Sequence, residues 1–356
     1  MKLSATHSMT NKMLKYTELK NSNRQDLKSI IPLEKPFTIL IEPSSLCNFR
    51  CTQCFQSLPG ESYFTRERQH MTMERFSKII SMLCSWKGPK IKVLKLSIYG
   101  EPLLNKNFIS MVRLAKSMDV AERIETTTNA SLLTPNLAKG LVDAGLDYIR
   151  VSIYGANERM HSDVTSSKVS LSSIKENLSY LKRYKSKQGA AKPIVACKMI
   201  DSLDEANSSF IKEFSEICDE CYIDEPHEWI NLEGTKFLEN YYKDSYDMIK
   251  EKLYSKFVER KACPMPFTTL AIRSNGSVSP CCVDYIGGTN IGNIDEENLQ
   301  EIWDGYEMKK FRMMHLSGKR RENMACANCN LQKSQHYTLD DIDSVDPAIL
   351  DIEQQK

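Results

Sequence analysis

Short apolar runs rich in β-branched residues alternate along the chain with longer segments in which apolar residues recur every three or four positions. The first pattern is typical of strands and the second of amphipathic helices. The predicted strands are 37–43, 92–100, 123–129, 147–155, 193–201 and 220–226. The predicted helices between them are 73–86, 108–118, 135–144, 171–187 and 204–217. These repeats predict an α/β fold with a parallel sheet, either open and doubly wound or a partial barrel.

The pattern changes after residue 230. A polar helical stretch leads there to a predicted hairpin that turns at Asn275-Gly276. Five apolar residues downstream have the spacing of one amphipathic helix: Leu299, Ile302, Trp303, Tyr306 and Phe311. We expect five segments: a lead-in at 1–35, the α/β domain at 36–230, a helical linker at 231–262, a small hairpin-plus-helix domain at 263–335, and a loose acidic tail at 340–356.

The composition limits the kinds of partner and the cellular compartment that we expect for this protein. The chain has 48 basic and 46 acidic residues, a formal net charge of +2, and so lacks the one-signed field that nucleic acid or an anionic membrane would require. No apolar stretch reaches the length of a bilayer crossing or forms the core of a signal peptide. We therefore expect a cytoplasmic protein whose partner is a small molecule or another protein. In that reducing compartment, 12 cysteines indicate metal, cluster or redox chemistry more than disulfides.

Three of these cysteines, Cys47, Cys51 and Cys54, follow the first predicted strand in a C-x3-C-x2-C pattern. Ligands of parallel α/β proteins collect at the carboxyl ends of strands, where this loop lies. Three thiols there are consistent with a zinc site that takes a remote fourth ligand, with buried structural thiols, or with an iron–sulfur cluster that keeps one iron open.

At these residues the chain resembles the radical S-adenosylmethionine (SAM) superfamily, over about Phe37 to Asn330. The other matching segments are YGEPLL (99–104), TTTNASLLT (126–134) and RVSIYGANERMH (150–161). The resemblance implies a partial (β/α)6 TIM-like barrel. It also implies a [4Fe-4S] cluster on the three cysteines, whose open iron binds SAM and cleaves it to a 5′-deoxyadenosyl radical.

The same resemblance implies a set of SAM contacts. Gly100 would admit the methionyl part, and the Glu101 carboxylate would pair with the ammonium group. Asn129 and Ser152 would hydrogen-bond the ribose or the carboxylate. The chain departs from the family pattern twice, with Tyr99-Gly100 in place of two glycines and with Gln53 in place of an aromatic residue. Contacts to adenine would then come from Phe49 or Phe55.

The second cysteine group resembles the SPASM/Twitch extension of radical SAM enzymes, which carries auxiliary clusters. Its members are Cys263, Cys281, Cys326 and Cys329. Four ligands imply one auxiliary [4Fe-4S] cluster held entirely by protein, and therefore two clusters in the chain. Cys282 competes with Cys281, but neighbouring strand residues point to opposite faces and the spacing from Gly276 favours Cys281. A zinc knuckle is the alternative for this group.

The resemblance also limits the reactions that we expect the protein to catalyse. Four-cysteine auxiliary domains resemble those of alcohol-oxidising enzymes that act on aminocyclitols, so we expect oxidation of a sugar, aminocyclitol or nucleotide sugar with an electron donor such as flavodoxin or ferredoxin. The alternatives are an epimerase, a peptide-modifying enzyme and a non-catalytic metal-binding protein. The candidate catalytic residues are His227 and Glu228, for proton removal, and Cys197, which could donate a hydrogen atom if its strand face points inward.

Overall fold

The computed structural model describes residues 25–52, 54–57, 68–226, 237–255, 257–284, 287–331 and 338–350. Its sheet has the strand order β6-β5-β4-β3-β2-β1-β7-β8-β9. The strands are β1 (Thr38–Ile41), β2 (Ile91–Lys95), β3 (Ala121–Thr128), β4 (Tyr148–Ser152), β5 (Ile194–Ile200), β6 (Glu220–Asp224), β7 (Thr269–Ile272), β8 (Ser277–Ser279) and β9 (Gly292–Asn293). The pairs from β6 to β1 are parallel and the sheet does not close. The predicted α/β partial barrel is therefore confirmed.

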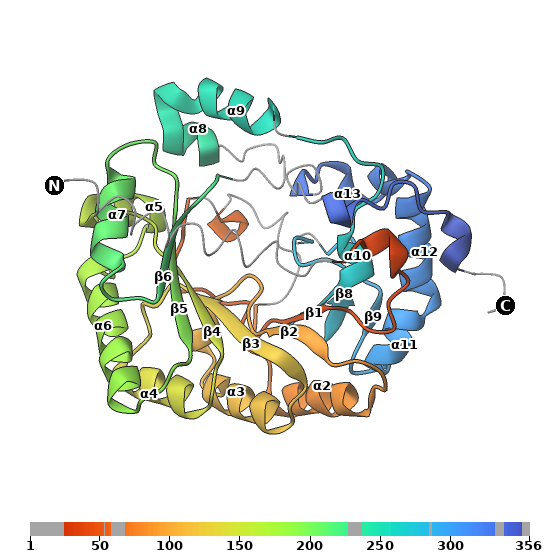
Figure 1. Cartoon of the computed structure of the whole chain (residues 1–356), viewed down its shortest axis with the longest axis horizontal. Coiled ribbons are helices and arrows are strands. Elements are labelled where there is room, and N and C mark those ends of the chain that lie inside the picture. Colours follow the sequence, from red (N-terminus) through yellow and green to blue (C-terminus); the bar gives the residue numbers. More distant parts are fainter. Residues whose placement is uncertain are drawn as a thin grey trace.

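Helices cover the outer side of this curved sheet (Figure 1). Those between the barrel strands are α2 (Met73–Ser85), α3 (Phe108–Ser117), α4 (Pro135–Asp143), α5 (Glu158–Thr165), α6 (Leu171–Lys187) and α7 (Ala206–Phe214). The later helices are α8 (Phe237–Tyr242), α9 (Tyr246–Ser255), α10 (Met265–Thr268), α11 (Leu299–Asp304), α12 (Tyr306–Leu316) and α13 (Met324–Ala327). Helix α5 was not expected from the sequence. No described helix combines the length and the apolar character needed to cross a membrane.

Polar residues fix where these helices begin. The side chains of Thr72, Thr134, Asn157 and Ser170 each accept a hydrogen bond from a backbone N–H in the first turn of α2, α4, α5 and α6. Such caps satisfy donors that the helix itself leaves open, which is why the apolar periodicity starts just after a Ser, Thr or Asn. Seven short 3-10 helices also lie among the described residues. Three of them carry residues discussed below: η1 (Leu27–Ser29), η4 (Pro102–Leu104) and η8 (Pro347–Leu350).

Strand alternation divides the core in two. Side chains such as Ile39, Ile149 and Val151 belong to the large core that packs under the helices. Tyr148, Ala196 and Tyr222, one position out of phase, form a separate small cluster on the inner face of the barrel. Successive side chains of a strand point to opposite faces, so this division identifies which residues face the barrel interior.

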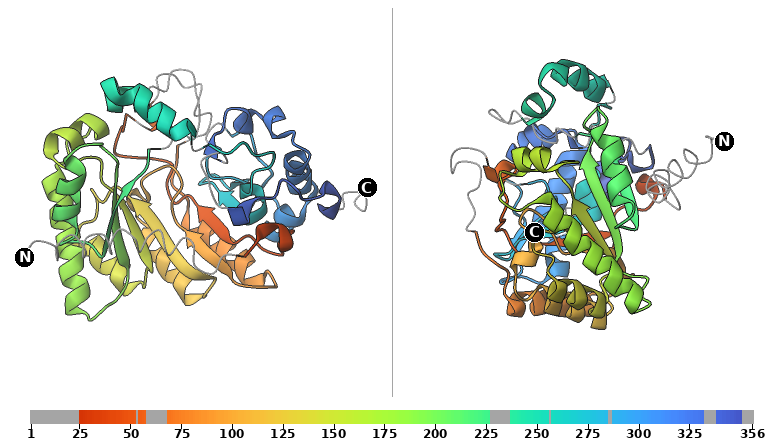
Figure 2. Two further views of the ribbon diagram at one scale, coloured as in Figure 1. Left: turned by 45° about the horizontal axis from the view of Figure 1, so that its top comes forward. Right: turned by 90° about the vertical axis from the view of Figure 1, so that its left-hand side faces the viewer.

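The hairpin of the C-terminal domain continues the barrel sheet. Strand β7 pairs in parallel with β1, and β8 pairs antiparallel with β7 across a turn in which Gly276 has φ +89°. The predicted turn is therefore confirmed. The C-terminal part shares the barrel core, since Leu270 and Trp303 belong to the same buried cluster as Ile39. Figure 2 shows its blue helices beside the red and orange strands.

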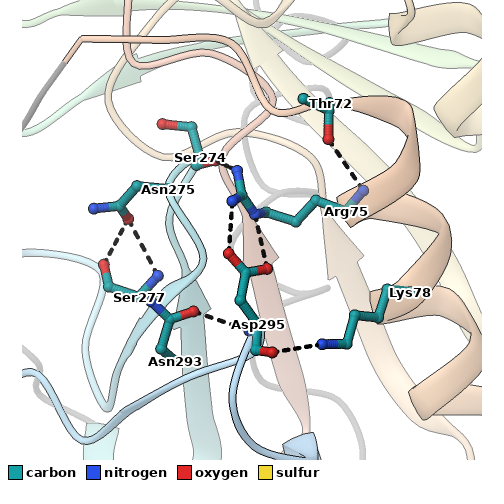
Figure 3. Close-up of polar contacts among 8 residues, drawn as sticks. All are labelled: Thr72, Arg75, Lys78, Ser274, Asn275, Ser277, Asn293 and Asp295. Carbon is teal, nitrogen blue, oxygen red and sulfur yellow. Dashed lines mark hydrogen bonds and ion pairs between the residues drawn. The ribbon is translucent and has the colours of Figure 1, made fainter.

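Polar contacts reinforce this junction between barrel and hairpin (Figure 3). Arg75 of α2 donates from Nη1 to the Ser274 carbonyl at 2.9 Å and forms an ion pair with Asp295 at 2.6 Å. Glu42, at the end of β1, accepts hydrogen bonds from the backbone N–H and hydroxyl of Ser274 at 3.1 and 3.0 Å. The Arg75 contacts hold the hairpin turn against α2, and the Glu42 contacts hold it against the end of β1, just before the cysteine loop.

Two sequence predictions about the C-terminal part were wrong. The single amphipathic helix is two helices, α11 and α12, broken at Gly305, and Tyr306 is half exposed because it begins the second helix. The acidic segment after residue 340 is not loose over its described part. Ile342 and Leu350 are buried against Leu27 and Ile31 of the N-terminal lead-in, so apolar contacts hold both ends of the described chain.

Candidate active site

The loop after β1 places its three thiols within electrostatic reach of one another. Cys54 N–H donates to the Cys51 carbonyl at 2.9 Å, and Phe49 N–H donates to Cys47 Sγ at 3.5 Å. Burial, with smaller contributions from the neighbouring thiols, raises the pKa of Cys51 to about 12 and that of Cys54 to about 11. Without metal these groups are neutral thiols. Three thiolates so close together need cations to offset their charge, which is what iron provides.

Helix α5 holds the backbone of this loop. Arg50 N–H donates to the Thr165 carbonyl at 3.0 Å, and Thr52 N–H donates to the Val164 carbonyl at 2.9 Å. Carbonyls in the last turn of a helix have no partner within the helix, so α5 offers them to the cysteine loop. The unexpected helix thus positions the residues between the three cysteines.

Gly100 approaches the same loop from the end of β2. A Cβ atom at this position would lie 2.1 Å from the Ser44 carbonyl oxygen and 2.5 Å from that of Leu46. Glu101 N–H donates to the Leu46 carbonyl at 2.8 Å. The close approach of the loop backbone therefore requires glycine at position 100, whether or not SAM is bound. The sequence analysis explained this glycine only by its predicted contact with SAM.

The Glu101 carboxylate is buried and already accepts three hydrogen bonds. Its Oε1 accepts from Thr128 Oγ1 at 2.6 Å and from Leu103 N–H, in η4, at 3.0 Å, while Oε2 accepts from Asn129 N–H at 2.8 Å. Burial raises the pKa of Glu101 to about 7 despite these bonds. A carboxylate offers about four acceptor sites, so room for one further donor remains on Oε2. The ammonium contact stays a prediction.

Asn129 joins the end of β3 to the cysteine loop. Its Nδ2 donates to Asn48 Oδ1 at 3.0 Å, and Asn48 Nδ2 donates to Ser131 Oγ at 2.8 Å. Ser131 returns hydrogen bonds to Asn129 Oδ1 from its N–H and hydroxyl, at 2.9 and 2.7 Å. The sequence reasoning named Asn129 but missed Asn48, whose only signal was its place directly after Cys47.

The predicted aromatic contacts lie in packed surroundings. Phe49 is buried between the rings of Tyr154 and His161, with centroids 6.3 and 5.9 Å away. Tyr154 lies near the three cysteines and interacts with Ser152: burial, followed by the nearby cysteines, raises the pKa of Tyr154. The side chain of Phe55 lies outside the described residues, as does Gln53. The SAM-contact roles of Phe49 and Ser152 stay predictions.

Tyr99 connects the two cysteine groups. Its ring lies 4.6 Å from the guanidinium carbon of the buried Arg273, in the arrangement of a cation–π contact. Arg273 Nη2 in turn donates to the carbonyls of Cys281 and Asp284, at 3.4 and 3.0 Å. Arg273, at the end of β7, was missed in the sequence because only the tertiary structure brings β7 beside β1.

The second cysteine group surrounds one cavity. Its lining includes all four predicted ligands, Cys263, Cys281, Cys326 and Cys329. Cys282 is not part of this lining; its thiol lies beside that of Cys281 and within electrostatic reach of Lys95 and Arg273. Within the described ranges, no three His, Cys, Asp or Glu side chains converge as closely as one metal ion requires. The donor set of four soft thiols around a shared cavity fits an iron–sulfur cluster.

Charged side chains occupy the inner face of the barrel. Lys198 pairs with Asp224 at 2.6 Å, and both lie two positions beyond inward-facing residues of β5 and β6. Burial, with the nearby Arg150 as a smaller cause, lowers the pKa of Lys95 to about 8. The interior therefore suits a polar ligand better than an apolar one.

Of the three predicted catalytic residues, Cys197 lies in the described part of the chain, and it does not face this interior. Cys197 is fully buried on the outer face of β5, in the core that includes Phe210 and Phe214 of α7, and its Sγ does not face the barrel interior. The condition for hydrogen-atom donation is not met, because the register of β5 directs Ala196 and Lys198 inward instead. His227 and Glu228 lie outside the described residues.

Comparisons with known proteins follow the same division of the chain. A model of the radical SAM superfamily matches residues 41–194, and a model of SPASM, an iron–sulfur cluster-binding domain, matches residues 263–330. The chain is 24% identical over 325 residues to the tungsten-containing aldehyde ferredoxin oxidoreductase cofactor-modifying protein of Pyrococcus furiosus, an alignment that covers 83% of this chain and 87% of that protein.

Two solved structures share the fold. The crystal structure of BtrN in complex with AdoMet and 2-DOIA aligns with a TM-score of 0.51 and 20% identity, over 85% of this chain and 97% of BtrN. Streptococcus suis SuiB bound to its precursor peptide SuiA aligns with a TM-score of 0.59 and 16% identity, over 86% of this chain and 72% of SuiB. By the two family models and this fold, the chain is a radical SAM enzyme with a C-terminal SPASM domain.

Proposed function

We propose that this enzyme oxidises a secondary alcohol of a small, polar, carbohydrate-type substrate to a ketone and uses an auxiliary cluster as the electron acceptor. The observation that carries the proposal is the gathering of Cys263, Cys281, Cys326 and Cys329 around one cavity. A cluster with four thiolate ligands has no open iron for substrate, so electron transfer is the chemical role left to it besides support of the fold.

The position of that cavity supports electron transfer from a substrate in the barrel to the auxiliary cluster. Cys281 follows β8 in the sheet that continues from β1, and β1 leads directly into the loop of Cys47. Arg273 and Tyr99 contact each other between the two sites. A substrate held over the inner face of the barrel would lie between the radical source and the acceptor.

The inner face supports a polar substrate. Lys95, Arg150, Lys198 and Asp224 offer charged donors and acceptors for hydroxyl, amino or phosphate groups. The similarity to BtrN, whose structure contains 2-DOIA, supports the same choice. We propose that these side chains orient the substrate and that one of them receives the hydroxyl proton.

When bound, the two [4Fe-4S] clusters and SAM would supply the radical and the electron acceptor, with a flavodoxin or ferredoxin as reductant. The overall change is then balanced. SAM and the alcohol give methionine, 5′-deoxyadenosine, the ketone and one proton. The electron that starts cleavage is recovered when the substrate radical is oxidised, so one 5′-deoxyadenosine forms for each ketone.

Peptide modification is the second candidate. The similarity to SuiB, which is bound to a precursor peptide, favours it. In that case the acceptor would oxidise a peptide-derived radical instead of a ketyl-type radical. The chain covers 72% of SuiB, so part of that protein has no counterpart in this comparison.

The test is a substrate screen with the reconstituted enzyme under anaerobic, reducing conditions. Sugars, aminocyclitols, nucleotide sugars and short peptides would be assayed for substrate-dependent release of 5′-deoxyadenosine. Mass spectrometry in deuterated buffer then identifies the reaction. Loss of two mass units from an alcohol supports the proposal, whereas a gain of one unit indicates epimerisation and excludes it. Turnover of peptides alone would favour the second candidate.

A further inference from the structure

His315, in α12, lies against two of the four cysteines around the auxiliary cavity. Its side chain is 1% exposed. Its Nδ1 is 3.2 Å from the backbone nitrogen of Cys263, and its Nε2 is 3.8 Å from Cys326 Sγ. The ring also lines the cavity itself, beside Phe311, whose centroid is 4.9 Å away. A polar ring thus sits between two predicted ligands of the cluster.

The contact with Cys263 determines which ring nitrogen carries the proton. The backbone N–H of Cys263 is a donor, so Nδ1 must present its lone pair. A neutral imidazole then has its only N–H at Nε2. That N–H is directed at Cys326 Sγ, and His315 therefore acts as a hydrogen-bond donor to this sulfur.

Other charges face the same cavity. Arg320 is buried, lines the cavity and donates from Nη1 to the Cys326 carbonyl at 3.1 Å. Asp284 also lines it, but its carboxylate is held by the N–H groups of Gly288 and Thr289, both at 3.0 Å, and by the Thr289 hydroxyl at 2.5 Å. The negative charge of Asp284 is therefore partly offset within its own loop.

We propose that His315 is a positioning residue that raises the reduction potential of the auxiliary cluster through an Nε2–H···Sγ bond to Cys326. Reduction adds negative charge, which spreads onto the ligand sulfurs. A donor to one of those sulfurs stabilises the reduced state more than the oxidised state. The positive charge of Arg320 also raises the reduction potential of the auxiliary cluster.

The consequence for the enzyme is a better electron acceptor, and this consequence rests on the proposed function. The hydrogen bond and its effect on the reduction potential do not depend on the proposed function. Both exist in the resting protein without substrate, so a test of the potential and a test of alcohol oxidation can fail independently.

The test is an anaerobic redox titration, followed by EPR, of reconstituted protein in which Cys47, Cys51 and Cys54 are alanine, so that only the auxiliary cluster is observed. His315→Leu removes the donor. We expect about a tenfold lower ratio of reduced to oxidised cluster at a fixed solution potential, which is ~59 mV for a one-electron couple. His315→Gln can accept from Cys263 and donate to Cys326, and it should restore the potential.

Two results would overturn the proposal. One is an unchanged potential in His315→Leu, and the other is a His315→Gln variant that shifts as far as the leucine variant. A second measurement needs no variant and covers the case in which His315→Leu fails to fold. ENDOR of the reduced auxiliary cluster in the unsubstituted His315 protein should show a coupled proton that exchanges in deuterated buffer, and protein with 15N-labelled histidine should show a coupled nitrogen. Absence of that proton would also contradict the hydrogen bond.

Discussion

Arg75 and Asp295 form a two-pronged ion pair across the junction between barrel and C-terminal domain. Arg75 Nε lies 3.1 Å from Asp295 Oδ1, and Nη2 lies 2.6 Å from Oδ2 (Figure 3). These residues are 220 positions apart in the chain. The pair holds the loop after β9 against α2, and so contributes to the placement of the second cysteine group relative to the first.

Breaking this ion pair should lower the free energy of unfolding by a small but measurable amount. The Asp295 side chain is 41% exposed, so solvent screens the pair and we expect Arg75→Ala to lower the free energy of unfolding by about 1 kcal/mol or less. A double-mutant cycle with Asp295→Asn in urea isolates the coupling. Lys78→Ala is the matched control, because Lys78 hydrogen-bonds the backbone carbonyl of Asp295 and not its carboxylate. A coupling energy of zero would show that the pair is incidental.

The same coupling should depend on pH. The hydrogen bond from Arg75 holds the pKa of Asp295 below its ordinary value of about 3.9. The stabilisation is therefore fully present above about pH 4 and is lost as pH falls through the lowered folded pKa. The difference between the urea midpoints of wild type and Arg75→Ala, measured between pH 7 and pH 2.5, should shrink at the acid end, where the hydrogen bond from Arg75 to the Ser274 carbonyl remains. A difference that persists unchanged at pH 2.5 contradicts this assignment.

Iron content should separate the two cysteine groups. The fully reconstituted enzyme should hold about eight irons, and the Cys47→Ala/Cys51→Ala/Cys54→Ala variant about four. Cys281→Ser should also lose about four irons, whereas Cys282→Ser should keep about eight, because only Cys281 lines the cavity. Iron and sulfide analysis of anaerobically purified protein measures this. A content of about four irons in the unsubstituted enzyme would contradict the presence of an auxiliary cluster.

Gly100→Ala should disrupt the first cluster and spare the second. The added Cβ would meet backbone oxygens of Ser44 and Leu46, and backbone cannot swing aside as a side-chain end can. We expect iron content to fall by about half, with the remaining cluster still reducible. Gly189→Ala is the control, since nothing lies within 4 Å of its Cβ position, although its φ of +60° makes the substitution mildly strained. Full iron content in Gly100→Ala would show that the loop backbone can shift to make room for the added Cβ atom.

Glu101 should make the metal-free protein less stable as pH rises. Burial raises its folded pKa to about 7, above an unfolded value of about 4.3. Between these values the folded state keeps a proton that the unfolded state has lost, so the free energy of unfolding decreases from about pH 4 to pH 7. Glu101→Gln should flatten that slope in urea titrations, and Glu74→Gln on the exposed side of α2 should not. With SAM present, Glu101→Gln should also bind it more weakly in equilibrium dialysis.

Much of this protein could be read from its sequence because the relevant signals are local. Strand and helix periods predicted the six β–α repeats, and Asn275-Gly276 predicted the hairpin turn, since each depends on residues a few positions apart. The cysteine spacings indicated both cluster sites, and the family models match the same two regions. Of the adjacent pair Cys281 and Cys282, the spacing from Gly276 favoured Cys281.

The tertiary structure decided what depends on contacts between distant segments. Parallel pairing of β7 with β1 places Arg273 over Tyr99, and packing of α12 brings His315 to Cys263 and Cys326. Register turned Cys197 outward, because a shift of one residue exchanges the two faces of a strand. No short stretch of sequence contains these relationships. They arise when the buried faces of separate elements pack together, and packing selects one arrangement for the whole chain.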